Sequence, residues 1–388
     1  DRWVRVRLTY RTELLRLIAF DVTHPDAIQA FSEVSKQLSD LATEAMEAGL
    51  QIARWELTSG SEHGTFSKEE VFNTRLSVIA MGKCGARELN YISDVDVIYV
   101  ADSGSPDLER NRALEIATRL ATRMMRAMDG TASEPMLWQV DPNLRPEGKA
   151  GALVRTVDSH VTYYERWAQN WEFQALLKAR FAAGDEELAN DYLNRIKPLV
   201  WSATGREGFV EAAQKMRERV MEHIPANEVN RQIKLGPGGL RDIEFTVQLL
   251  QLVHGRTDES VRVADTLSAI DTLNSGGYIS RSDSRTFTEH YKFLRSIEHR
   301  IQFAQMRRTH LMPESDSQIR AIARGINIRW TADQLTERWN EVKLEVRSLH
   351  QKVFYRPLLS AVAKLGDTAQ LSSDQIFDRL KEIGRAHV

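Results

Sequence analysis

Three aspartates offer the clearest chemistry in this sequence. Asp94 and Asp96 stand at the start of the apolar run 95–100, and Asp141 closes another short apolar run, residues 136–141. If residues 95–100 form a strand, positions 94 and 96 share a face, because alternate side chains of a strand point the same way. We expect both carboxylates to converge at one strand end, with Asp141 beside them. Hard oxygen ligands in this arrangement suit Mg²⁺, which binds carboxylates together with substrate phosphates.

A glycine turn shortly before these aspartates could hold the phosphates. Gly82 and Gly85 follow the apolar run 75–81, and a short helical turn should begin there and end before Ser93. Backbone N–H groups at such a turn can bind phosphate oxygens, and Lys83 could add a positive charge. Three acids facing this turn would form a phosphoryl- or nucleotidyl-transfer site. An isolated Asp-x-Asp pair is more often a solvated loop, and isolated glycines are more often simple turns.

Three further cations are candidates for anion contacts. Arg145 lies in Leu-Arg-Pro-Glu-Gly, directly after Asp141, although this segment could be only a turn. Lys178 shares a face with Trp171 and Gln174 if residues 167–180 are helical. Arg241 follows the Gly-rich turn 236–239 and is spaced for one helical face with Glu244 and Gln248. A polar stripe on so apolar a helix must face water, a partner or a site.

The elements that position these residues form a small α/β unit within a mostly helical chain. The runs 75–81, 95–100 and 136–141 predict strands, and the spacing of apolar residues over 107–128 predicts a helix between the last two. Apolar stripes over 34–55, 283–307 and 335–353 predict long amphipathic helices, of the kind found in bundles rather than coiled coils. Pro357 should bend or end the last of these.

We divide the chain into four segments: an N-terminal helical region (1–60), an α/β core (61–157), a helical extension that completes the cleft (158–235) and a C-terminal helical bundle (236–388). The predicted fold class is α+β and mostly helical.

Composition excludes several classes of protein. The chain of 388 residues is 42% hydrophobic and 27% charged, as globular proteins are. No apolar window is long enough to cross a membrane. A net charge of -2 gives no general footprint for nucleic acid. Cys84, the single cysteine, permits no internal disulfide, and the first residues have no signal-peptide pattern, so we expect a cytoplasmic protein.

Four motifs in order resemble bacterial glutamine synthetase adenylyltransferases. They are residues 82–96 (GKCGARELNYISDVD), 140–148 (VDPNLRPEG), 171–180 (WEFQALLKAR) and 233–245 (IKLGPGGLRDIEF). The resemblance covers roughly residues 70 to 355 and implies a nucleotidyltransferase core of the polymerase-beta-like type, with a mixed sheet flanked by helices. Two departures are Cys84 in place of a usual leucine, and Pro142-Asn143 where other members carry Met-Arg.

The resemblance also implies an activity. Members are bifunctional: one half attaches AMP from ATP to a tyrosine of glutamine synthetase, and the other removes it by phosphorolysis, releasing ADP. The form Gly-Gly-Leu-Arg-Asp-Ile-Glu, which contains Arg241, is similar to the adenylyl-removing half. By resemblance, Asp94, Asp96 and Asp141 hold Mg²⁺. The same resemblance assigns phosphate or nucleotide contacts to other residues: Gly82, Lys83, Ser93, Arg145, Lys178 and Arg241.

The implied partners are adenylylated glutamine synthetase, orthophosphate and ADP, with ATP and a PII signalling protein as further candidates. Three alternatives remain open from the sequence. They are the adenylylating half, a regulatory half that binds PII through its helices, and a nucleotidyltransferase that extends polynucleotides. The acidic trio disfavours a purely regulatory half, and the net charge and the later motifs disfavour the polynucleotide enzyme.

Overall fold

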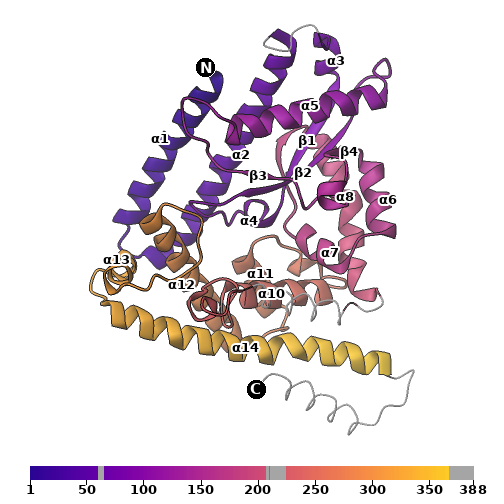
Figure 1. The fold of residues 1–388 in the computed structure, drawn as a ribbon. Coiled ribbons are helices and arrows are strands. Elements are labelled where there is room, and N and C mark those ends of the chain that lie inside the picture. The colour runs from indigo at the N-terminus through magenta and orange to yellow at the C-terminus, as the bar shows by residue number, and fades with distance from the viewer. Residues whose placement is uncertain (60–64, 207–208, 210–223, 367–388) are drawn as a thin grey trace.

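A computed structural model describes residues 1–59, 65–206, 209 and 224–366. The predicted boundary at residue 60 and the last part of the predicted bundle, 367–388, lie outside the described residues. The four-segment division of the chain stays a prediction. Figure 1 shows a sheet with helices on both faces, and a second, helical region on one side of it.

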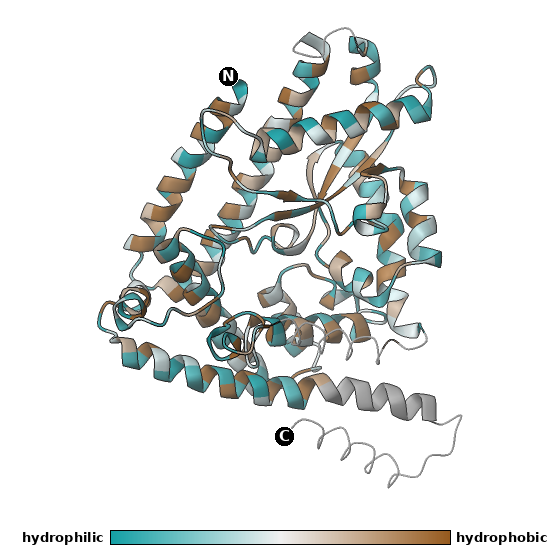
Figure 2. Cartoon of the chain, viewed as in Figure 1, coloured by the Kyte–Doolittle hydropathy of each residue, from teal (hydrophilic) through white to brown (hydrophobic). Residues whose placement is uncertain are grey.

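A mixed sheet of five short strands forms the centre of the first region. Its strands are β1 (Thr74–Ala80), β2 (Val95–Ser103), β3 (Val140–Asp141), β4 (Val154–Arg155) and β5 (Arg180–Gly184). The order is β3-β2-β1-β5, and β4 also pairs with β2. Strand β1 is antiparallel to β2 and β5, whereas β3 and β4 run parallel to β2. The strands carry brown, hydrophobic residues in Figure 2 because both faces are covered.

Each face of the sheet has its own hydrophobic core. Helices α1 (Arg2–Thr23), α2 (Ala27–Ser59) and α5 (Arg110–Asp129) cover one face, where Val78 and Val97 are fully buried. The other face packs on α6 (Val157–Arg166), α7 (Asn170–Leu176) and α8 (Glu186–Ser202) through Ile79 and Ile98. Short α3 (Lys68–Phe72) precedes β1, and α4 (Gly82–Gly85) follows it. This alternation along β1 and β2 reflects the period of two of a strand.

The second region is mainly helical, and an isolated β-bridge joins Gln232 to Leu311. It contains α10 (Leu240–His254), α11 (Thr266–Ser275), α12 (Arg281–Gln305), α13 (Asp316–Ile326) and α14 (Ala332–Gly366). One-turn 3-10 helices lie at Gly148–Ala150, Ala203–Gly205, Val229–Arg231 and Glu259–Val261. A third hydrophobic core includes Phe287, Leu294 and Leu335, all fully buried. Helix α14 runs along the outer side of this region (Figure 1).

Most predicted elements are confirmed, and three details are wrong. The strand predicted over 136–141 is only two residues long, and the helix predicted over 167–180 ends at Leu176, so that β5 begins at Arg180. Helix α14 continues past Pro357 to Gly366. A proline removes one backbone donor and fixes φ near its helical value, so a helix can pass through it at the cost of one hydrogen bond. Among the described residues, no helix is long and apolar enough to span a membrane.

Helix α1 is tied to the segment that leads into β3. Arg7 is fully buried and donates to the carbonyl oxygens of Ala127 at 3.1 Å, Gly130 at 2.7 Å and Glu134 at 2.8 Å. These carbonyls include the unpaired end of α5, where backbone oxygens need donors from outside the helix. One side chain therefore fixes the path of the chain from α5 toward Asp141.

Candidate functional site

The register of the sheet brings the three aspartates together. In the parallel pair of β2 and β3, Val95 lies opposite Val140 and Asp96 lies opposite Asp141. Asp94 directly precedes β2. One ligand oxygen from each carboxylate lies within 4.8 Å of the others. The predicted convergence of Asp94, Asp96 and Asp141 is therefore observed.

This cluster is electrostatically unfavourable by itself. Burial, with the charges of Asp94 and Asp141 nearby, raises the pKa of Asp96 to about 6. Three oxygen donors that repel one another in a partly buried site match the preferences of a hard divalent cation. The donor set therefore fits a metal ion of the Mg²⁺ type.

The glycine turn packs directly against this cluster. Gly82 has φ +53°, and a Cβ built at this position would lie 2.4 Å from Oδ2 of Asp96. Any side chain at position 82 would strain the backbone and displace that carboxylate. At Gly85 a Cβ would lie 1.9 Å from the carbonyl oxygen of Lys178. Both predicted glycines are thus required by close approach, and the short helix α4 begins at the first of them.

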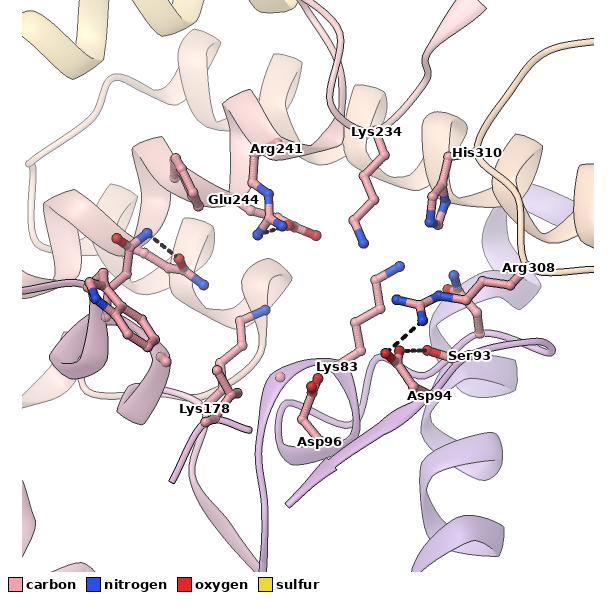
Figure 3. A pocket seen from close by; sticks show the side chains of 18 of the residues that line it. Lys83, Ser93, Asp94, Asp96, Lys178, Lys234, Arg241, Glu244, Arg308 and His310 are labelled. Carbon is pink, nitrogen blue, oxygen red and sulfur yellow. Dashed lines mark hydrogen bonds and ion pairs between the residues drawn. The ribbon is translucent and has the colours of Figure 1, made fainter. Parts of the chain in front are cut away.

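Asp94, Asp96, the glycine turn and the helical region line one cavity of roughly 400 Å³, and Asp141 lies next to Asp96 outside this lining. Figure 3 shows its two walls: Lys83, Ser93, Asp94 and Asp96 on one side, and Lys234, Arg241, Glu244 and His310 on the other. Ser93 Oγ lies 3.5 Å from Oδ1 of Asp94. The wall opposite the aspartates is mainly cationic, which is the arrangement needed to hold phosphate groups between them.

Lys83 joins the two walls. Its Nζ lies 3.1 Å from both carboxylate oxygens of Glu298, which is fully buried on α12. Glu298 also contacts Arg295 at 2.8 Å and His310 Nδ1 at 2.7 Å. Burial opposes ionisation of Glu298, but Lys83 and Arg295 outweigh it and hold the pKa of this carboxyl well below its usual range. Lys83 thus faces the cavity while paired with an ionised carboxylate of the helical region.

Lys178 makes a second link between the regions. Its Nζ donates to Oε2 of Glu88 at 2.9 Å, and both side chains are buried. Oε1 of Glu88 accepts from the backbone N–H of Thr266, at the start of α11. Lys178 lines the cavity as predicted, although it follows α7 rather than lying within it.

The predicted stripe on α10 also faces the cavity. Arg241, Glu244 and Gln248 all line it. Arg241 lies 3.8 Å from Oε2 of Glu244, and its guanidinium lies 4.9 Å from the centre of the Phe245 ring. Gly239 caps this helix, and Gly238 has φ +74°, with the backbone of Lys343 where a Cβ would be. The glycine-rich turn therefore seats α10 against α14.

Comparisons with known proteins give the chain its family. Residues 3–195 match the family model for glutamate-ammonia ligase adenylyltransferase. Residues 211–354 match the model for GlnD PII-uridylyltransferase. The chain is 52% identical to a bifunctional glutamine synthetase adenylyltransferase/adenylyl-removing enzyme of Leifsonia xyli, over 99% of this chain and 39% of the relative. The chain therefore contains a domain of this adenylyltransferase family.

Other members support the assignment. Relatives of the same description from Streptomyces coelicolor and Mycobacterium avium are 49% and 48% identical, over 99% and 94% of this chain. The chain spans 37% and 35% of their lengths, so it corresponds to somewhat more than a third of these bifunctional proteins. The fold is accordingly a nucleotidyltransferase-type domain of this family, followed by a helical region like that of uridylyltransferases.

Two predicted site residues, Asp141 and Arg145, do not line the cavity, and Arg145 makes its contacts elsewhere. Its guanidinium donates to the backbone carbonyl oxygens of Pro142 at 2.9 Å and Gly151 at 3.2 Å. It therefore closes its own loop, and no contact with the acidic cluster is seen among the described residues. Its neighbour Leu144 lines the cavity instead.

Sequence reasoning missed several residues of the site. Arg308 lies 2.7 Å from Oδ2 of Asp94, and Lys234, His310 and Glu298 complete the charged surroundings. Lys234 stands within one of the quoted motifs and could have been found there. Glu298 carried no local signal, because it meets Lys83 across 215 residues of sequence.

We predict that Asp96→Asn stabilises the metal-free protein near pH 7.5 by about 1–3 kcal/mol. The native pKa of about 6 lies above the ordinary value of 3.8, so the native state binds this proton more tightly than the unfolded state does. The wild type should therefore recover this stability as pH falls from about 6 to about 4, and the difference should shrink. Urea unfolding in EDTA at about pH 7.5 and at about pH 4 measures the difference in unfolding free energy between the variant and the wild type. A constant difference across pH would contradict the assignment.

A second prediction concerns Glu298. Glu298→Gln should destabilise the protein by about 3–5 kcal/mol, because it leaves Lys83 and Arg295 as buried charges without their carboxylate. The matched control is Glu341→Gln, which removes a half-exposed partner of Arg338 and should change stability by no more than about 0.5 kcal/mol. Urea unfolding compares the two variants, and equal effects would reject a central role for the buried pair.

Proposed function

We propose that this chain is the adenylyl-removing part of its bifunctional family, and that it cleaves adenylyl-tyrosine on glutamine synthetase by phosphorolysis. The observation that supports a nucleotidyl-transfer reaction is a cavity in which Asp94 and Asp96 face a group of basic side chains, with Asp141 next to them in the carboxylate cluster. The names of its relatives supply the target, glutamine synthetase. The form of the motif around Arg241 supports the removing direction.

In the proposed reaction an oxygen of hydrogen phosphate attacks the phosphorus of the adenylyl group. A new P–O bond forms as the bond from phosphorus to the tyrosine oxygen breaks, giving ADP. The proton of hydrogen phosphate ends on the tyrosine oxygen. Tyrosine has a pKa of about 10, so its oxygen leaves far more readily than an alkoxide would. This chemistry needs positioning and charge compensation more than a protein nucleophile.

The side chains divide this work between the two walls. Asp94, Asp96 and Asp141 would hold Mg²⁺, which would neutralise charge on the reacting phosphoryl oxygens when bound. The turn at Gly82 allows phosphate oxygens to approach the backbone closely. Lys83, Lys178, Lys234 and Arg241 line the cavity with basic side chains. Burial, with nearby cations, lowers the pKa of Lys83 and of Lys234, and a bound phosphate would favour their charged forms. Because Lys83 and Lys178 already pair with buried carboxylates, their ammonium groups are fixed in place before substrate binds.

The catalytic assignment predicts a large loss of activity in Asp94→Asn. The variant should lose most ADP release from adenylylated glutamine synthetase, at least 100-fold, and should keep its helical circular-dichroism spectrum. It should also lose stabilisation by added Mg²⁺. Asp102→Asn is the matched control, since Asp102 lies on the same strand and pairs with exposed Arg110. Undiminished turnover in the Asp94 variant would reject the site.

The direction of reaction is tested separately. The chain is incubated with adenylylated glutamine synthetase, Mg²⁺ and orthophosphate, and in parallel with unmodified synthetase and ATP. ADP release in the first mixture supports the proposal. Incorporation of AMP in the second mixture alone would assign the chain to the adenylylating activity. A PII signalling protein is a further candidate partner, and if it acts on this chain, adding it should change the rate of the first reaction.

A further inference from the structure

One end of the cavity carries little charge. Along α10, the cavity-lining residues change from Arg241 and Glu244 to Phe245 and Gln248. Gln248 stands seven residues beyond Arg241, which is about 10 Å along a helix at 1.5 Å per residue. Figure 3 shows the charged groups, from Arg308 and Asp94 to Lys178 and Arg241, arrayed along the remainder of the cavity. The cavity thus offers a charged end and a neutral end about one nucleoside length apart.

An aromatic ring is left open at the neutral end. Trp171 on α7 lines the cavity and keeps 39% of its surface exposed. Within the described part of the chain, no aromatic ring or guanidinium stacks on it, whereas the ring of Phe245 is already covered by Arg241. A large apolar ring exposed inside a polar cavity is the kind of surface on which a flat ligand stacks. Such stacking tolerates any nucleobase.

A pair of amides lies beside this ring. Nε2 of Gln174 donates to Oε1 of Gln248 at 2.7 Å, and the two side chains join α7 to α10. The bond leaves the carbonyl oxygen of Gln174 to accept and the amino group of Gln248 to donate. Adenine presents the complementary edge, with an amino donor next to a ring-nitrogen acceptor, and glutamine amides recognise this edge in other complexes.

We propose that this neutral end is the adenine subsite, in which Trp171 stacks on the base and the Gln174–Gln248 pair binds its amino edge. The inference rests on the proposed nucleotide chemistry and extends it by assigning the residues that hold the base. It places the phosphates at the opposite, charged end, next to the aspartates. Trp171 and the amide pair then determine which nucleotide is accepted, and the charged end determines what happens to its phosphate.

Calorimetric titration of the full chain with ADP in Mg²⁺ tests the stacking role. Trp171→Ala should weaken ADP binding about 5- to 100-fold, as the loss of one stacked base does. Binding of pyrophosphate, which has no base, should be unchanged. Trp171→Phe should restore most of the ADP affinity. Trp167→Ala is the matched control, because Trp167 is 68% exposed and lies outside the cavity lining.

The proposed contact between the Gln174–Gln248 pair and the amino edge of adenine is tested by comparing the affinities for two nucleotides. The wild type should prefer ADP to inosine diphosphate, in which a carbonyl replaces the adenine amino group. Gln248→Met, which keeps the side-chain length and removes the amide, should abolish that preference. An unchanged preference would overturn the assignment of the amide pair.

The outcomes separate this inference from the proposed function. If the wild type binds ADP and Trp171→Ala has no effect, the subsite is wrong and the nucleotide chemistry stands. If Trp171→Ala weakens ADP and pyrophosphate equally, Trp171 supports the fold of the cavity and the stacking role is overturned. If the wild type binds neither compound, both proposals fall.

Discussion

The buried carboxylate of Glu298 is a central contact between the two regions of this protein. Glu298 is fully buried on α12, and it contacts Lys83 of the sheet region together with Arg295 and His310 of the helical region. A buried ionised carboxylate is stable only if nearby cations and hydrogen-bond donors replace the water around it. For Glu298 these partners come from both sides of the cavity. The ion pair between Lys83 and Glu298 therefore joins the glycine turn to α12 and holds the two walls of the cavity together.

The same logic recurs along the interface. Glu88 bonds to Lys178 and to the first turn of α11, and the backbone of Ile92 donates to Gln302 on α12. All these groups belong to the segment between α4 and β2 or to its partners. That segment follows the glycine turn directly and binds the helical region. Polar contacts of this kind are specific in geometry, since each buried group must find its own partner.

Strand and helix spacing in the sequence predicted those parts of the site that come from residues close together in the chain. Asp94 and Asp96 share a face because strands alternate, and Gly82 stands beside them because the turn follows the preceding strand. The stripe of Arg241, Glu244 and Gln248 followed from helical spacing. Arg308 and Glu298 could not be predicted, because each meets a partner more than two hundred residues earlier. Glu298 on α12 contacts Lys83, and Arg308, beyond the end of α12, contacts Asp94. Arg145 was assigned to anions for its charge and its place after Asp141, but its guanidinium is used up by backbone oxygens of its own loop.

Because β3 is only two residues long, the position of Asp141 also depends on helix α1. Two residues of strand cannot hold a side chain in register alone, and a slip by one position would turn Asp141 to the opposite face. Other bonds support this alignment: Arg7 donates to the carbonyl oxygens of Gly130 and Glu134 upstream of the strand, and the backbone N–H of Val95 donates to the carbonyl oxygen of Gln139. Helix α1 contributes no residue to the cavity lining. Its Tyr10 and Leu17 belong to the core on one face of the sheet, so removal of α1 would expose that core and also release the segment that leads to Asp141. Although it lies outside this lining, helix α1 helps through its Arg7 to hold the segment that positions Asp141.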